Sequence, residues 1–414
     1  MIKNLVWTSY IFMWSFAGIY LMPNIQSLGE LLFFFLAGLC LIRFWRSTND
    51  GVIFCIFMIL VFHLFRIVLN AIDGVDLHDV FRNAHRIFLY FVPIVFGVIL
   101  RKYEDVKTAL MIVAWMLIIS ATSYFIVRIG ISDLGYLVEE DAASGAMRIR
   151  HILFEFIYIF GILFLSLSLS ANNNKRKTFY AVLYLISLAV IVDSYFRSLL
   201  IGFLFCTLVV LLLSAIKHRK VLSKSFKTLF FIGIGGFIFL CANNPGILVA
   251  RISEQLVDEV QTQTGTFLSR MVIWNVRSDA VMADNRLALG YGFVSSKQDE
   301  EALLADRILN PVMMDSDNGY ASLLVAYGVL GFIVFGVFYA VLLIDSIKLY
   351  RFSDGELASI AMTVIAVLFS NLLISFFKDF FLWVYSVLSF GLLIGIYLSM
   401  KRINCLKISI LKGN

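Results

Sequence analysis

The sequence predicts an all-α integral membrane protein with about twelve transmembrane helices and one large outer loop that contains short helices. Two observations predict this class. The chain is 61% hydrophobic and 15% charged, with a mean hydropathy of +0.90, whereas soluble domains contain about 45–50% apolar and about 25% charged residues. Apolar runs of roughly 17–25 residues, long enough to cross a bilayer as an α-helix, recur along the whole chain.

The apolar runs define the expected spans in order. The first follows Lys3 and shows no small-residue cleavage site, so we expect it to stay as a span. The expected spans are residues 4–22, 28–42, 51–70, 84–100, 108–129, 151–171, 178–194, 197–216, 226–242, 317–344, 357–377 and 379–400. They form one integrated membrane domain, with helices one to nine in 1–241, an outer loop at 242–316 that stays outside the bilayer, and helices ten to twelve with a tail in 317–414.

The basic residues predict the orientation. Twenty of the 34 lie in lysine-rich connections on alternate sides of the spans, and the positive-inside rule assigns these connections to the cytoplasm. Both termini are then cytoplasmic, and the loop 242–316 faces outward. Topology alone accounts for the basic pI of about 9.0, so the sequence predicts no nucleic-acid partner.

The basic residues on the outer side differ in kind, because all but Lys297 and Lys378 are arginines. Arginine presents a planar fork that binds phosphate in bidentate fashion, whereas lysine presents a point charge. The outward arginines therefore predict a phosphorylated ligand. They are Arg66, Arg82, Arg86, Arg128, Arg148, Arg150, Arg197, Arg251, Arg270, Arg277, Arg286 and Arg307.

Two of these arginines fall inside expected spans. Arg66 lies in the third span and Arg128 near the end of the fifth. A charge in hydrocarbon is costly, so such a residue usually faces a cavity or a partner. The alternative is that its side chain snorkels to the outer interface.

The outer loop carries a helical pattern from Thr266 to Asn285. Arg270, Trp274 and Arg277 follow at i, i+4 and i+7 and share one face. Two arginines with an indole between them match a pyrophosphate beside a sugar or lipid. The alternative is an interfacial helix on anionic headgroups, anchored by Trp274. Arg286 then leads into a Gly-Tyr-Gly turn at 290–292.

The tenth span opens with Asp317, Asn318 and Tyr320. Polar residues in this position are ordinary helix caps. The functional interpretation is that Asp317 deprotonates a sugar hydroxyl, with Asn318 and Tyr320 at the same site. The five cysteines and five histidines show no metal-ligand spacing, and no phosphate-binding glycine loop is present, so the sequence predicts neither metal nor cofactor.

The chain resembles the O-antigen polymerase and ligase family of bacterial polysaccharide assembly. In topology the resemblance covers the whole chain. In sequence it rests on Phe196-Arg197-Ser198 and on Arg270 and Trp274 followed by Gly290-Tyr-Gly292. It implies an enzyme of the bacterial inner membrane that takes a glycan from undecaprenyl pyrophosphate on the outer face. It also implies that Arg197 and Arg270 hold the diphosphate.

One difference from the ligase pattern indicates which branch of the family this chain resembles more. Ligases bear a histidine before Asn-x-Tyr where the loop re-enters the membrane, and this chain has Asp317 there. The sequence therefore favours a polymerase, with a ligase as the first alternative. The second alternative is a flippase or exporter of lipid-linked sugars, and the third is a membrane scaffold. We expect chain-length control to need a separate partner protein.

Overall fold

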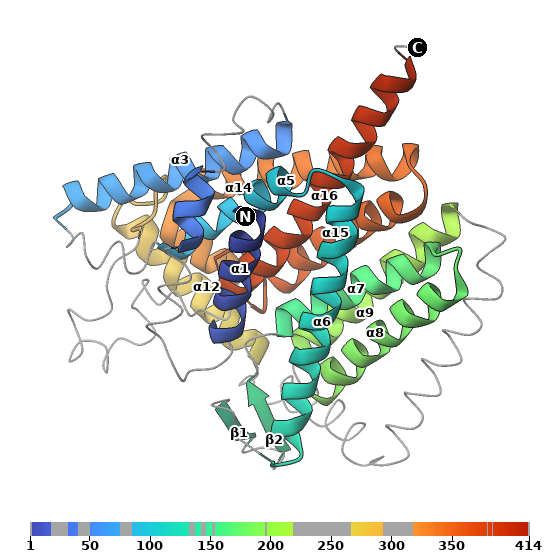
Figure 1. The fold of residues 1–414 in the computed structure, drawn as a ribbon. Helices are drawn as coiled ribbons and strands as arrows, with labels where there is room; N and C mark the ends of the chain where they lie inside the picture. The colour runs from blue at the N-terminus through green and yellow to red at the C-terminus, as the bar shows by residue number, and fades with distance from the viewer. Residues whose placement is uncertain are drawn as a thin grey trace.

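A computed structural model describes residues 2–17, 32–39, 50–74, 85–131, 137–141, 146–150, 154–194, 197–217, 266–292, 318–378, 380–382 and 384–412. The predicted ninth span and Asp317 lie outside these residues, as does most of the predicted outer loop. The described chain is helical apart from one two-stranded sheet, which confirms the helical class (Figure 1).

The described elements are almost all helices. In order they are α1 (Ile2–Ala17), α3 (Gly51–Ile72), the 3-10 helix η2 (His85–Tyr90), α5 (Phe91–Ile99), α6 (Tyr103–Arg128), β1 (Leu137–Asp141), β2 (Ala146–Arg150), α7 (Phe154–Ser170), α8 (Asn174–Asp193), α9 (Arg197–Lys217), α12 (Thr266–Ala283), α14 (Gly319–Phe352), α15 (Gly355–Ile374) and α16 (Val384–Lys412).

Six described helices are long and apolar enough to cross a membrane. They are Gly51–Ile72, Tyr103–Arg128, Ser198–Lys217, Gly319–Phe352, Gly355–Ile374 and Ser386–Cys405. They coincide with six predicted spans, and the shorter apolar helices Ile87–Ile99 and Phe154–Ser170 coincide with two more. The chain is therefore a multi-pass helical membrane protein, and the total of twelve spans stays a prediction.

The sheet is a feature that the sequence analysis did not predict. Strand β1 pairs antiparallel with β2, with Glu139 opposite Arg148 and Leu137 opposite Arg150. The hairpin follows the end of α6, and β2 contacts that helix. Each strand has only five residues, too short a run for a period-2 pattern to stand out among long apolar helices.

Helix α7 forms the centre of the bundle. All its side chains from Phe154 to Leu169 are buried, and it packs against α6, α8, α9, α15 and α16. A helix that is apolar on every side is stable only when it is surrounded. Figure 1 shows α7, α8 and α9 side by side.

Glycines let α5 and α16 pack closely. A Cβ on Gly395 would lie 2.5 Å from the Cβ of Phe96, and one on Gly97 would lie 3.3 Å from the Cβ of Leu398. Small residues of this kind let two helix backbones approach within the membrane, where apolar packing supplies much of the association energy.

Gly395→Val is therefore expected to force these helices apart and to lower stability by about 1–3 kcal/mol, the usual cost of overpacking. Gly336→Val is the matched control, because a Cβ at Gly336 meets nothing within 4 Å. The measurement is the temperature at which half of the detergent-purified protein stays monodisperse. Equal midpoints for the two variants would contradict the close packing.

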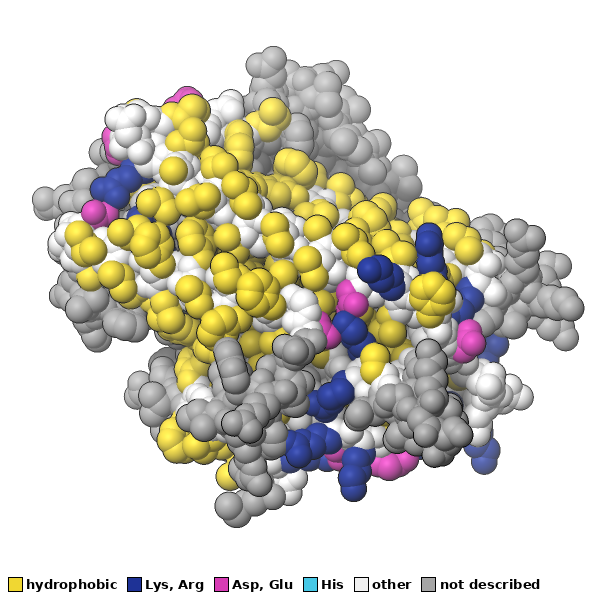
Figure 2. All heavy atoms as spheres, turned by 90° about the horizontal axis from the view of Figure 1, so that it is seen from above, with side chains coloured by type: hydrophobic (Ala, Val, Ile, Leu, Met, Phe, Trp, Pro, Cys, Tyr) yellow, Lys and Arg dark blue, Asp and Glu magenta, His cyan; other side chains and the backbone are white. Residues whose placement is uncertain are grey.

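Large apolar side chains cover the faces of α3 and α14 that no other described helix covers. Phe54 and Phe65 of α3 are 63% and 48% exposed, and Ile333 of α14 is 54% exposed. Figure 2 shows a broad hydrophobic surface with Lys, Arg, Asp and Glu side chains gathered beside it. Such a surface fits acyl chains rather than water.

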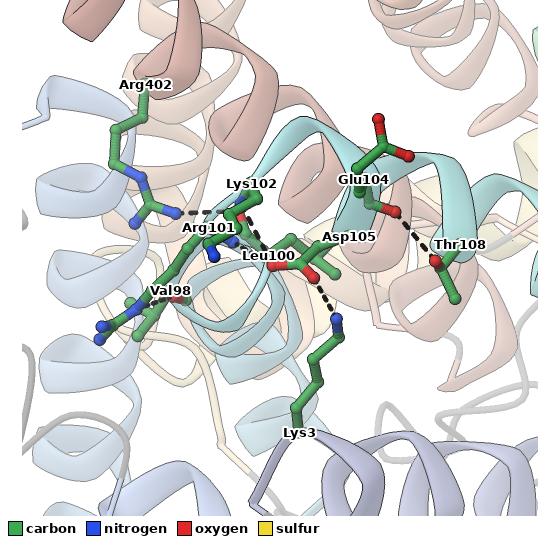
Figure 3. Close-up of polar contacts among 9 residues, drawn as sticks. All are labelled: Lys3, Val98, Leu100, Arg101, Lys102, Glu104, Asp105, Thr108 and Arg402. Carbon is green, nitrogen blue, oxygen red and sulfur yellow. Dashed lines mark hydrogen bonds and ion pairs between the residues drawn. The ribbon is translucent and has the colours of Figure 1, made fainter.

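Ion pairs link the helix ends that the charge pattern predicts on the cytoplasmic side. Lys401 of α16 lies 2.7 Å from Asp50, the N-cap of α3, and 2.6 Å from Asp345 of α14. Lys3 of α1 pairs with Asp105 of α6 (Figure 3).

Further contacts extend this network across the same end of the bundle. Arg402 of α16 donates to the Leu100 carbonyl over 2.9 Å (Figure 3). Tyr103 of α6 donates to Glu356 of α15 over 2.7 Å, and Arg176 of α8 lies 3.7 Å from the same carboxylate. The ends predicted to share one side therefore do lie together. Their assignment to the cytoplasm stays a prediction.

Candidate functional site

Helix α14 is broken near its start. Gly328 has φ 63° and ψ −160°, which no α-helix contains. The rings of Tyr320 and Phe332 stack with centroids 6.1 Å apart, although a straight helix would separate residues twelve apart by about 18 Å. Residues 319–327 therefore form a separate short helix that turns back at Gly328, and residues 329–352 form the longer part of α14.

The segment 286–292 fills the break. A helix break leaves N–H and C=O groups without their intrahelical partners, and within a membrane the protein itself must supply new ones. Three backbone hydrogen bonds do so: Tyr291 N–H to Val325 O at 2.7 Å, Val329 N–H to Leu287 O at 2.9 Å, and Leu330 N–H to Ala288 O at 3.1 Å. We call this segment the docked loop.

Glycines make this docking possible. Gly290 and Gly292 have φ +66° and +81°, in the left-handed region. A Cβ on Gly290 would lie 2.4 Å from Val325 O, and one on Gly292 would lie 2.0 Å from Asn70 Oδ1. The predicted Gly-x-Gly turn is thus confirmed, and it is a tightly enclosed one.

We call the contact between the docked loop and the break in α14 the junction. It packs against α3 of the helical bundle. Counted at about 1.5 Å per residue, Arg66 stands about 24 Å along α3 from Asp50, and Gly328 about 25 Å along α14 from Asp345. The placement of 242–316 outside the bilayer stays a prediction, and the docked loop at its described end packs between α3 and α14. Its polar backbone is tolerated there because it is paired.

Helix α3 presents a polar stripe to this junction. His63, Arg66, Asn70 and Asp73 follow at i, i+3, i+7 and i+10, so they share one face. The first three are at most 1% exposed. Of these four residues only Arg66 is among the residues predicted from the sequence, although the same helical spacing links it to the other three.

Each end of the stripe contacts a different part of the junction. His63 Nδ1 lies 2.8 Å from the Tyr327 hydroxyl, just before the break. Arg286 Nη1 lies 2.6 Å from Asp73 Oδ2. This ion pair uses one of the five N–H donors of Arg286, and an arginine so held keeps donors for a ligand.

Arg66 lies between these two contacts and donates from Nη2 to the Gly290 carbonyl over 3.0 Å. At 1% exposure it does not snorkel to the interface. Of the two alternatives that its position in a span leaves open, the structure supports a protein partner.

Helix α12 confirms the predicted helix in the loop. Trp274 is half-buried and meets the Phe332 ring edge-on at 6.5 Å, and Arg277, one turn on, is 6% exposed. Helix α12 packs on α14, with Trp274 of the predicted shared face in contact with it and Arg277 of the same face buried. Arg270 lies on the same helix, and its side chain is outside the described residues.

The docked loop is also tied to the end of α12. The Tyr291 hydroxyl donates to Asp284 Oδ2 over 2.5 Å and lies 3.0 Å from Ala280 O. Burial, together with the hydrogen bond to Asp284, raises the pKa of Tyr291 to about 12. The phenol therefore stays protonated as a donor at neutral pH.

The start of α14 is fixed by hydrogen bonds. Asn318 is the N-cap, and its Oδ1 accepts from Tyr320 N–H and Ala321 N–H, both at 3.1 Å. The Tyr320 hydroxyl donates to Leu372 O of α15 over 2.6 Å. The capping interpretation of Asn318 is confirmed, and its binding role stays a prediction. Asp317 immediately precedes this cap.

A second polar cluster lies at the neighbouring helix ends. Arg128 Nε lies 3.0 Å from Asp193 Oδ2, which also accepts from the Tyr124 hydroxyl at 2.5 Å. Buried Glu155 of α7 pairs with Lys378. Three residues before Lys378, the Ser375 carbonyl accepts from Gly319 N–H at 2.8 Å, so this cluster borders the start of α14.

The predicted site residues are thus brought together in part. Around the break in α14 lie Arg66, Trp274, Arg277, Arg286, Asn318 and Tyr320. Arg128 belongs to the second cluster. Arg148 and Arg150 lie on β2 and Arg197 begins α9, but the side chains of these three are outside the described residues. Within the described ranges, no three His, Cys, Asp or Glu side chains are grouped as metal ligands.

Comparison with known proteins gives one family. Residues 182–336 match the family model described as O-antigen ligase. No curated protein matches the chain. The matched region runs from α8 through α12 and the docked loop to the break in α14, so it contains both motifs on which the resemblance rests. The chain is therefore recognised, through residues 182–336, as similar to the O-antigen ligase and polymerase family.

Proposed function

We propose that the chain is a polysaccharide (O-antigen) polymerase. It transfers a growing glycan from undecaprenyl pyrophosphate to the non-reducing end of a lipid-linked repeat unit, on the outer face of the inner membrane. The observation that carries the proposal is the gathering of Arg277, Arg286 and Trp274 around the break in α14. This gathering lies inside the region that matches a family of enzymes acting on lipid-linked glycans.

The proposed reaction is a direct displacement. A hydroxyl oxygen at the end of the acceptor sugar attacks the anomeric carbon of the donor glycan. The bond from that carbon to the diphosphate oxygen breaks, and the lipid diphosphate leaves with the electron pair. One inversion results, and the hydroxyl proton passes to a base.

The leaving diphosphate gains negative charge as this bond breaks. Donors aimed at developing charge in a water-poor site lower the barrier most. We assign this role to Arg197, Arg270 and Arg277, with Arg286, Arg128, Arg148 and Arg150 as further contacts to the donor. The indole of Trp274 would shelter the adjoining sugar or lipid, and Asn318 and Tyr320 would border the acceptor.

Asp317 is the proposed base, because it is the carboxylate that immediately precedes the cap of α14. Asp317→Asn removes the proton acceptor and keeps the size of the side chain. Transfer is expected to fall by about 100-fold or more, within the range of general base catalysis. The measurement is turnover of purified lipid-linked repeat unit in nanodiscs. Wild-type turnover in Asp317→Asn would exclude this carboxylate as the base.

A ligase is the second candidate, because the matching family model is described as O-antigen ligase. It would use the same donor and pass the glycan to a lipid A core. Nanodiscs that contain repeat units, with and without lipid A core, separate the two. Longer lipid-linked chains support the polymerase, and product on the core alone supports the ligase. Translocation of the lipid-linked sugar without any transfer would overturn both in favour of a flippase.

A further inference from the structure

Helix α3 braces the junction between the docked loop and α14. Its polar stripe reaches Tyr327 before the break, through His63, and the docked loop itself, through Arg66 and Asp73. We propose that Arg66 is a positioning residue that holds the docked loop in the break of α14, and thereby sets the location of the arginines proposed to bind the diphosphate.

Arg66 is buried and bonds to the backbone of the docked loop. Its guanidinium is 1% exposed, and no carboxylate of the described residues lies within ion-pair distance of it. A buried cation is stable only when it bonds to polar groups. Arg66 donates from Nη2 to the Gly290 carbonyl over 3.0 Å. A charge-assisted bond to a backbone carbonyl fixes the backbone and not merely a side chain.

The docked loop also packs closely against Asn70 of α3. Asn70 is one turn beyond Arg66 and fully buried. Its amide lies against Gly292, where a Cβ would come within 2.0 Å of Oδ1. The docked loop is thus fixed to α3 at Gly290 by a hydrogen bond, and at Gly292 by close contact with Asn70. These two contacts define one position of the loop on α3.

The docked loop is linked to α12, the helix that bears two of the proposed binding residues. It begins at Arg286, which Asp73 of the same stripe also holds. Tyr291 ties it to Asp284 at the end of α12, the helix that bears Trp274 and Arg277. A shift of the loop therefore moves these groups relative to α14. The proposal rests on the proposed function for its catalytic consequence, but not for the loop docking itself.

The test uses the full-length protein in nanodiscs and the variants Arg66→Met, Arg66→Lys and Gly292→Ala. The first readout is amide hydrogen exchange at Tyr291, Val329 and Leu330, whose N–H groups bond across the break. In Arg66→Met these amides are expected to exchange at least about tenfold faster, as local opening predicts, while α15 is unchanged. Arg66→Lys is expected to keep most of the protection, because it retains a cationic donor.

The second readout is the kinetics of transfer. A misplaced site costs about 100-fold in kcat, whereas loss of a direct substrate contact in the ground state raises KM. Arg66→Met is expected to lower kcat by about that factor with KM within about threefold, and Arg66→Lys to recover most of the rate. A selective rise in KM would overturn the proposal, because it would make Arg66 a substrate contact.

Gly292→Ala disturbs the docked loop at its other contact with α3, where the added Cβ would meet Asn70. If Arg66 acts through that loop, Arg66→Met combined with Gly292→Ala is expected to be no slower than the worse single variant, since coupled residues are not additive. Additive losses, or unchanged exchange in Arg66→Met, would overturn the proposal. Absence of transfer in the wild type would overturn the proposed function instead, and the exchange data would still decide whether Arg66 holds the loop.

Discussion

Gly290→Ala is expected to abolish transfer, by more than about 100-fold, while leaving the protein inserted in the membrane. The alanine Cβ would lie 2.4 Å from Val325 O and 2.8 Å from both Gly328 N and Leu324 O. These are backbone atoms of α14 and cannot rotate away. The φ of +66° at this position adds strain for any residue with a Cβ. The docked loop would therefore move out of the break in α14, and Arg277 and Arg286 would no longer be held in their positions.

The matched control is Gly336→Ala on α14, where a Cβ meets nothing within 4 Å. It is expected to transfer like the wild type. Both variants are compared by turnover of lipid-linked repeat unit at equal amounts of folded protein. Normal turnover in Gly290→Ala would mean that the docked loop has no part in the reaction.

Arg277→Lys is expected to lower kcat at least about tenfold, although the charge is kept. A lysine has no planar fork, so it cannot bind two diphosphate oxygens in parallel. The loss corresponds to about 1.4 kcal/mol or more of transition-state stabilisation. The effect should appear in kcat, because the charge on the diphosphate grows as the bond breaks.

The control for this prediction is Arg351→Lys, an exposed arginine in the last turn of α14, at the opposite end of the bundle. Circular dichroism and the unfolding temperature of both variants separate a folding defect from a kinetic one. If Arg277→Lys turns over like Arg351→Lys, the two-point grip at Arg277 is wrong.

Much of the fold follows from the sequence, because helix length and hydropathy are local properties. The spans at α3, α6, α15 and α16 are examples, and α12 followed from its own periodicity. The Gly-x-Gly turn was also visible, since two glycines two residues apart have few other uses in a polar segment. The charge pattern also predicted which helix ends share one side of the bundle. The ion pair between Lys401 of α16 and Asp50 at the start of α3 is an example.

The rest depends on contacts between distant segments. The sequence of α14 reads as one uninterrupted apolar run, because a glycine alone does not break a helix. Gly328 leaves the helix only where Leu287 and Ala288, about forty residues earlier, supply the missing acceptors. Asp193 of α8 bonds to Arg128 and Tyr124 of α6, and no local sequence pattern links these residues.

The central claim is that this chain lengthens lipid-linked glycan. The most direct test is a gel of surface glycan from the native strain after deletion of the gene. The account predicts that the ladder collapses to the core plus one repeat unit, because export and ligation persist while polymerisation stops. Bare core, with long chains accumulating on the carrier lipid, would contradict it and assign ligation to this chain.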